Sequence, residues 1–317
     1  MLKTILRTAI SLGFLGLLFY LMRGSLPEIF RLLRNINRPI CLGATLLFLS
    51  TSLILAKRLE MIFRACQAPI KFREGLHLTF LGYFFNNFLP TSMGGDLVKI
   101  LCASRITGQP VRAASAVLMD RIMGLFVFIV LPAFCFFFLK SDVPRVVPIL
   151  IYSFLGFSLF GLFLLFERRI ADRLPLPKKI RKLYHEMHSF KEQKSLLVET
   201  ILLSLLGQGV VVVVTYLLAL SLENKAEVSP LPFFILVPVV HLVSLFASLN
   251  GLGIREGAYI YFLSPYLGKE HSAALGVLWL ALLMVVSLVG GLIYLTLPRY
   301  HLRSIRKKMS PDLQTVK

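Results

Sequence analysis

Long apolar segments separated by basic patches constrain the fold of this chain more than any other feature of its sequence. Six segments reach or approach the roughly 17 residues that a helix needs to cross a bilayer. They cover residues 4–22, 40–56, 113–139, 146–166, 196–222 and 273–297. Their continuous hydrophobicity differs from the periodic amphipathic pattern of soluble helices. The sequence therefore predicts an all-α polytopic membrane protein with six full transmembrane helices.

Two further apolar regions are interrupted by glycine-rich sequences. The region 75–104 is broken at residues 90–95, and the region 231–267 is broken at residues 250–253. Proline ends a helix, and glycine allows a tight turn. We therefore expect each region to form two shorter helices, either as a re-entrant hairpin or as a pair of short crossings.

The distribution of Lys and Arg predicts how these segments are oriented. The connection 167–195 and the tail 299–317 are rich in basic residues, and the positive-inside rule places both in the cytoplasm. The connection after residue 222 has no excess of positive charge and is expected outside. The chain is then a single transmembrane domain, residues 1–317, of the cytoplasmic (inner) membrane, with both termini in the cytoplasm.

This orientation makes the two broken regions enter the membrane from opposite faces. Residues 1–139 and 146–298 then contain the same succession of two helices, a broken hairpin and a further helix, with every direction reversed. Such an inverted-topology repeat is typical of secondary transporters. One connection, predicted to lie outside, disagrees with the charge rule because it carries Arg23, Arg31, Arg34 and Arg38.

The formal net charge of +19 does not indicate nucleic-acid binding here. Hydrophobic residues make up 56% of the chain, and most basic residues lie beside apolar segments. Orientation in the membrane and contact with anionic headgroups explain that placement, and Lys57 and Arg58 are assigned to this role. The four cysteines are widely spaced without a CxxC pair, so they predict packing residues rather than a metal site.

The first break carries polar groups at the start of a new helix. Asp96 suits the positive end of the helix dipole, and the backbone N–H groups there can bind an anion such as a lipid phosphate. The alternative is that Ser92 and Asp96 only cap the helix. The candidate substrate-binding residues at this break are Asn87, Thr91, Ser92, Gly94, Gly95 and Asp96.

The second break places two adjacent charges between apolar helices. Such charges are costly in a membrane unless they face protein, water or a ligand, and a phosphate is a suitable partner for Arg255. The alternative is that Arg255 and Glu256 are hydrated at the outer interface. The candidate substrate-binding residues here are Asn250, Gly253, Arg255 and Glu256.

Two more charges complete the candidate site. Asp120 and Arg121 lie about two turns into the apolar segment 113–139, so they should face the protein interior. They either form ion pairs with the breaks or contact the substrate. His77 and His241 each precede a break and are expected to be hydrogen-bonded packing residues, with a proton relay as the alternative.

Signatures of the common enzyme classes are missing from the sequence. It contains no GxSxG, no HExxH, no P-loop and no glycine fingerprint for nucleotides placed on a strand. We therefore expect no enzyme activity, no catalytic residue, no metal ligand, no cofactor and no ATP hydrolysis.

Three motifs, at residues 86–96, 119–124 and 251–257, resemble the flippase-like membrane domain of bacterial lysylphosphatidylglycerol synthases, which also occurs as a stand-alone protein. They occur in the right order across nearly the whole chain. The resemblance implies movement of an aminoacylated phospholipid between leaflets. Aminoacyl transfer belongs to a separate C-terminal domain that is not expected here. Other stand-alone relatives are associated with envelope-glycan or polyprenyl-lipid pathways, so the lipid stays open.

These observations favour a flippase-like lipid translocase that moves a phospholipid or polyprenyl-linked headgroup. Its expected partners are membrane lipids that are anionic or bear a phosphate, and not nucleic acids. One alternative is a non-transporting partner or regulator of a lipid-modifying enzyme or glycosyltransferase. Another is a membrane-embedded transferase that uses Asp96 or Glu256 as a base.

Overall fold

The structure is a computed structural model, which describes residues 23–89, 94–139, 143–166, 184, 186–187, 193–222, 228–245 and 251–300. These ranges form ten α-helices and a short 3-10 helix, with no strand among the described residues. The prediction of an all-helical protein is confirmed. The first predicted span, residues 4–22, lies outside the described residues.

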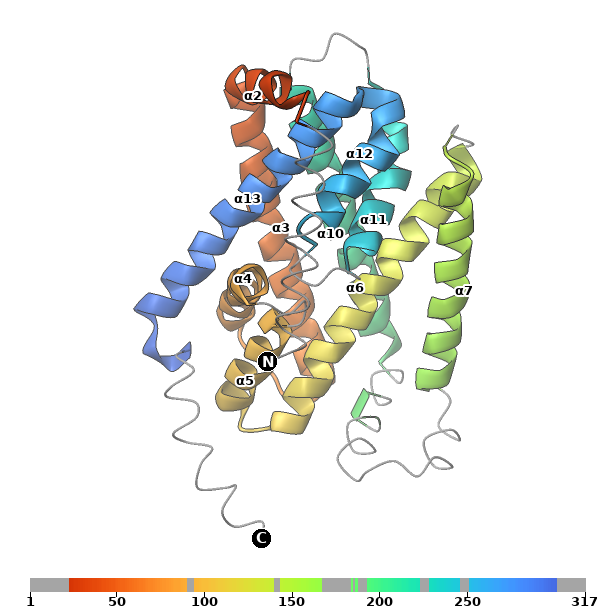
Figure 1. Ribbon diagram of the computed structural model, residues 1–317. Coiled ribbons are helices and arrows are strands. Elements are labelled where there is room, and N and C mark those ends of the chain that lie inside the picture. The colour runs from red at the N-terminus through yellow and green to blue at the C-terminus, as the bar shows by residue number, and fades with distance from the viewer. Residues whose placement is uncertain are drawn as a thin grey trace, which may run out of the picture.

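Four helices of the described ranges are long and apolar enough to cross a membrane. They coincide with four of the predicted spans and are α3 (Arg38–Ala65), α6 (Pro110–Leu139), α10 (Lys194–Ser221) and α13 (Lys269–Thr296). A fifth predicted span corresponds to α7 (Val146–Phe166), which runs beside α6 in Figure 1. These helices agree with an integral membrane protein.

Four shorter helices form two hairpins in the interior. The first broken region gives α4 (Phe72–Phe88) and α5 (Gly94–Thr107), and the second gives α11 (Leu231–Leu245) and α12 (Ile254–Leu267). At a rise of about 1.5 Å per residue, each helix is shorter than the roughly 30 Å apolar core of a bilayer. Figure 1 shows α4 and α5 in the lower half of the bundle and α11 and α12 in the upper half. Each predicted break therefore separates two short helices.

The two ends of the bundle carry the remaining elements. Helix α2 (Leu26–Arg34) lies at the upper end of Figure 1, against α13, and the 3-10 helix η2 (Pro298–Tyr300) follows α13 toward the lower end. The upper end also contains the start of α3 and the end of α10. The lower end contains the end of α3 and the starts of α6 and α10.

Buried apolar side chains form two clusters, one nearer each end. The larger cluster surrounds α10 to α13 and includes Phe233 and Tyr259, both without exposed surface. The smaller cluster joins the lower parts of α3, α4, α5 and α6 around Phe63 and Leu81. Because lipid tails are as apolar as these side chains, close packing rather than exclusion of water holds helices together within a membrane.

Glycines set the closest helix contacts. A Cβ atom on Gly290 of α13 would lie 2.9 Å from Cβ of Phe84 on α4, and closer still to the backbone carbonyl of Phe80. A Cβ atom on Gly75 of α4 would lie 2.9 Å from the carbonyl oxygen of Ala56 on α3. Small residues of this kind let membrane helices approach at backbone distance, and they hold α4 between α3 and α13.

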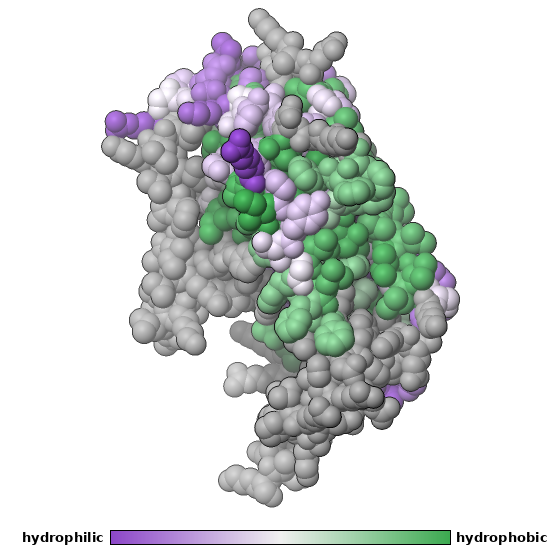
Figure 2. Space-filling model, turned by 90° about the vertical axis from the view of Figure 1, so that its right-hand side faces the viewer, coloured by the Kyte–Doolittle hydropathy of each residue, from purple (hydrophilic) through white to green (hydrophobic). Residues whose placement is uncertain are grey.

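Large apolar side chains also cover the outside of the long helices. Figure 2 shows hydrophilic residues gathered toward one end, with a broad apolar surface below them. An apolar surface of this extent is unfavourable in water but suits lipid tails. The more exposed of these side chains include Phe134, Phe137, Phe157, Phe160, Leu292 and Leu295.

The cysteines behave as packing residues. All four are free, and Cys66, Cys102 and Cys135 are buried. Burial raises the pKa of the Cys66 thiol, which follows the end of α3, to about 12. The thiolate needed for redox or metal chemistry is therefore not populated at neutral pH.

Candidate functional site

Two adjoining cavities lie in the interior where the hairpins approach each other. We call them the α5 cavity, of about 240 Å³, and the α12 cavity, of about 230 Å³. They adjoin because both are lined by the same four residues, which are Tyr83, Asn86, Arg121 and Leu245. The cavities thus reach from the first hairpin to the second.

The α5 cavity is built around an ion pair between α5 and α6. Nη1 of Arg121 lies 2.9 Å from Oδ2 of Asp96, and Nζ of Lys99 lies 4.0 Å from Oδ1 of the same carboxylate. Asp96 stands in the first turn of α5, where the helix dipole favours a negative charge. The expected ion pair between Arg121 and a break is therefore present, and it connects the first hairpin to a long helix.

A second, more deeply buried pair lines the same cavity. Nη2 of Arg58 lies 2.7 Å from Oδ1 of Asp120, and Arg58 Nε donates to that oxygen at 2.8 Å. Arg58 Nη1 also donates to Oγ of Ser204 at 2.9 Å. Arg58 is 7% exposed, so its assignment as a headgroup contact at the membrane surface is wrong. Helix α3 continues past residue 56 to Ala65, and Asp120 on α6 neutralises the buried charge of Arg58 within it.

The first hairpin is closed by a glycine and an asparagine. The backbone N–H of Gly95 donates to Oδ1 of Asn86 at 2.8 Å, which joins the start of α5 to the end of α4. A Cβ atom on Gly95 would lie 2.7 Å from that oxygen. Gly94 and Gly95 are both buried where α5 packs against α4. Asn86 also lines the α5 cavity.

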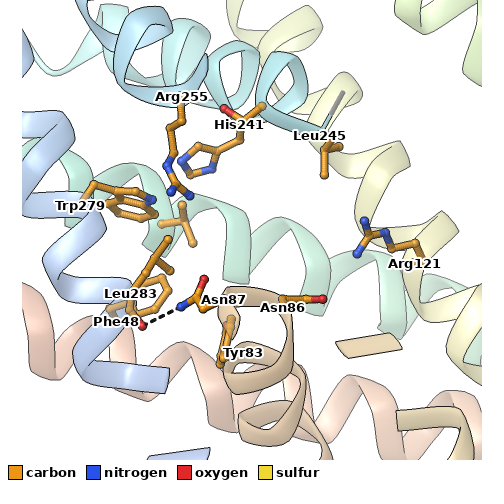
Figure 3. A pocket seen from close by; sticks show the side chains of 12 residues that line it. Phe48, Tyr83, Asn86, Asn87, Arg121, His241, Leu245, Arg255, Trp279 and Leu283 are labelled. Carbon is orange, nitrogen blue, oxygen red and sulfur yellow. Dashed lines mark hydrogen bonds between the residues drawn. The ribbon is translucent and has the colours of Figure 1, made fainter. Parts of the chain in front are cut away.

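The α12 cavity is dominated by Arg255. Its side chain extends from the first turn of α12 toward His241 and Trp279, with Asn87 below and Arg121 across the cavity (Figure 3). Arg255 is only 5% exposed, yet its Nε has no hydrogen-bond partner among the described residues. That nitrogen lies 3.6 Å from Oε1 of Glu256, beyond hydrogen-bond distance. A buried guanidinium group with unused donor capacity faces the cavity.

Glu256 caps its own helix. Its Oε2 accepts a hydrogen bond from the backbone N–H of Gly253 at 2.6 Å, and Gly253 has a φ of 82° that favours glycine. Glu256 is 8% exposed, so the pair of Arg255 and Glu256 is not hydrated at an interface. Gly253 and Glu256 thus shape the start of α12 and do not line either cavity.

Neutral polar side chains complete the α12 cavity. Nδ2 of Asn87 donates to the carbonyl oxygen of Leu283 at 3.2 Å and contacts Oγ of Ser287, which ties α4 to α13. Nε2 of His241 lies 3.2 Å from the hydroxyl oxygen of Tyr259. The ring of His241 also packs against Trp279, at 5.1 Å between centroids. The predicted packing role of this histidine is supported, although it also lines the cavity.

The charges of the site favour an anionic ligand. Among the described lining residues, four side chains are cationic and two are carboxylates. The two carboxylates, Asp96 and Asp120, are each paired with an arginine, whereas the one described carboxylate near Arg255 is that of Glu256, which also caps α12. A low-dielectric site strengthens the attraction between a guanidinium group and a phosphate. No cluster of three potential metal ligands occurs among the described residues.

The structure brings together five of the predicted site residues as cavity-lining side chains: Asn87, Asp96, Asp120, Arg121 and Arg255. Gly94, Gly95, Gly253 and Glu256 support them through the turns and caps. Thr91, Ser92 and Asn250 lie outside the described residues. Six further lining residues are not among those predicted from the sequence as part of the site: Arg58, Tyr83, Asn86, Lys99, His241 and Trp279.

One feature of the sequence indicates that Arg58 lies within a continuing helix and not at the membrane surface. The residues after it, including Leu59, Ile62 and Phe63, continue an apolar helical face. A basic residue followed by such a face is more consistent with a helix that continues than with a membrane boundary.

Comparison with known proteins identifies the family. The chain matches the family model described as the lysylphosphatidylglycerol synthase TM region over residues 4–309. No curated protein matches the chain. Because the match covers nearly the whole sequence, the resemblance carried by the three motifs is confirmed, and the chain belongs to the lysylphosphatidylglycerol synthase transmembrane-region family.

Proposed function

We propose that the protein is a lipid translocase that moves a phosphate-bearing headgroup, on a phospholipid or a polyprenyl-linked lipid, between the leaflets of the cytoplasmic membrane. The proposal rests on the side chain of Arg255, which is buried at a cavity between the hairpins and whose Nε finds no hydrogen-bond acceptor in the described part of the chain. A buried polar group is costly unless it is hydrogen-bonded, and a bound phosphate would supply the acceptor that Nε does not find in Glu256, 3.6 Å away.

The proposed path follows the two cavities. The headgroup would contact Arg255 in the α12 cavity and Lys99 in the α5 cavity, while Arg121, which lines both, would stand at the passage between them. The lipid tails would stay in the surrounding hydrocarbon. Compensation of the phosphate charge along the path lowers the cost of taking it across the apolar core.

The proposed topology is an inverted repeat of residues 1–139 and 146–298, with the segments 167–195 and 299–317 and both termini in the cytoplasm. The α4–α5 and α11–α12 hairpins in opposite halves of the bundle support this arrangement. Broken helices that meet near the middle of the membrane form the substrate site of many transporters with such repeats.

Arg255→Gln tests the proposal with purified protein in vesicles that contain fluorescent phosphatidylglycerol. The initial rate at which label from the inner leaflet becomes accessible to a membrane-impermeant quencher outside the vesicles reports flipping. A hydrogen bond to a charged group contributes about 1.5–3 kcal/mol, so we expect a loss of about tenfold or more. Arg255→Lys should retain part of the rate because it keeps the charge.

Arg64→Gln is the matched control, because Arg64 is exposed and pairs with Glu60 outside the cavities. It should flip lipid at the wild-type rate. Equal rates for wild type and Arg255→Gln would refute the role of Arg255. A wild-type protein that flips neither fluorescent phosphatidylglycerol nor fluorescent polyprenyl phosphate would refute translocation and favour a non-transporting partner of a lipid-modifying enzyme.

A further inference from the structure

Helix α2 has two distinct faces. Ile29 and Leu32 are buried in the larger apolar cluster, whereas Arg31 and Arg34 are exposed on the other side. Phe30 is 67% exposed, although it is large and apolar. A short helix that combines a buried apolar face, exposed arginines and an exposed aromatic ring is typical of a helix at a membrane surface.

Polar contacts hold α2 at one end of the bundle. Oγ of Ser25, just before the helix, donates to Oε1 of Glu270 at the start of α13, at 3.0 Å. The backbone N–H of Asn37, just after the helix, donates to the carbonyl oxygen of Ser221 at the end of α10, at 2.8 Å. Both contacts are made at helix ends, so α2 lies where the long helices leave the apolar core (Figure 1).

The charge around α2 is strongly positive. Arg23, Arg31, Arg34 and Arg38 are all exposed, and the one carboxylate within this stretch, Glu28, lies 2.6 Å from Arg31. A helix that only connected two spans would gain nothing from concentrating arginines on its solvent face. Anionic headgroups at the membrane surface would complement this charge.

We propose that α2 is an interfacial helix that binds the headgroups of anionic phospholipids in the leaflet at its end of the protein. Phe30 enters the boundary between headgroups and tails, and the four arginines contact phosphates around it. This role also explains why basic residues occur on a connection that the positive-inside rule does not favour for them. The inference is independent of whether the protein flips lipids.

A tryptophan at position 30 tests this proposal. The chain contains a single tryptophan, Trp279, so Phe30→Trp in a Trp279→Phe background gives a fluorescence signal from α2 alone. The protein is placed in vesicles of phosphatidylglycerol and phosphatidylcholine in which only one of the two lipids has brominated chains, at equal bromine content. Bromine quenches nearby tryptophan, so the ratio of the two signals reports the local lipid composition.

We expect quenching by brominated phosphatidylglycerol to exceed that by brominated phosphatidylcholine at least about twofold, and the preference to fall at high salt. The triple variant with Gln at Arg31, Arg34 and Arg38 should lose the preference for phosphatidylglycerol. Replacement of Lys57, Arg64 and Arg73 by Gln removes the same charge at the other end of the bundle. It should leave the preference for phosphatidylglycerol unchanged. If Trp279→Phe does not fold, the Phe30→Trp signal minus that of wild type gives the same ratio.

Three outcomes would overturn the proposal. Equal quenching by the two lipids would show that α2 has no anionic preference. If the preference for phosphatidylglycerol persists in the triple variant, groups other than the three arginines cause it. Quenching by neither lipid would show that position 30 is shielded from the membrane, as it would be under a bound protein.

Discussion

At the scale of single residues, each arginine of the interior has a different environment. Arg58 is paired with Asp120 and also donates to Ser204, so three long helices share one buried network. Arg121 pairs with Asp96 at the edge of a cavity. Nε of Arg255 has no hydrogen-bond partner in the described ranges and lies beside Glu256, which caps α12. The same side chain therefore serves as a structural tie in the first case, and in the last we propose that it binds the headgroup.

Removal of Arg58 should destabilise the protein severely. Arg58→Ala leaves the Asp120 carboxylate buried without its main partner, which costs about 3–5 kcal/mol for a buried pair. We expect a clearly lower midpoint of thermal unfolding in detergent. The double variant Arg58→Ala/Asp120→Ala should recover part of the loss, because no uncompensated charge remains. A double variant no more stable than the single one would contradict this account.

At the scale of helices, close approach decides where the short helices lie. Helix α4 touches α3 through Gly75 and α13 through Gly290, and its last turn carries Asn86 and Asn87 to the cavities. Gly75 and Gly290 lie at contacts between helices and not at the two helix breaks. They set the distance at which polar groups of the first hairpin meet α13 and α12.

Gly290→Ala should weaken the contact between α4 and α13 and so destabilise the protein. The added methyl group meets the backbone of Phe80 and Cβ of Phe84, and overpacking of this kind costs about 1–3 kcal/mol. Gly156→Ala is the control, because a Cβ atom there meets nothing within 4 Å and alanine favours a helix more than glycine does. Thermal unfolding should show a lower midpoint for Gly290→Ala and no loss for Gly156→Ala. Equal midpoints would argue against a tight α4–α13 contact.

At the scale of the whole molecule, the proposed orientation predicts which end of the bundle faces the cytoplasm. The α2 end should lie outside and the end that carries Arg73 inside. In a variant without the native cysteines, a membrane-impermeant maleimide should label Asn35→Cys, just after α2, in intact cells. It should label Arg73→Cys only after permeabilisation. Both positions are exposed, so access to the thiol is not limited by burial. Labelling in the reverse order would invert the proposed orientation.

The sequence by itself determined the helical membrane class, four of the spans and the two interrupted regions, because hydrophobic length and helix breaks are local properties of a chain. It also marked Asp96, Asp120, Arg121 and Arg255, since charges within apolar helices are costly. Only the tertiary structure decided their partners: Arg58 meets Asp120 across 62 positions, whereas no described residue accepts a hydrogen bond from Nε of Arg255. Such pairings depend on how distant helices pack, which no local pattern encodes.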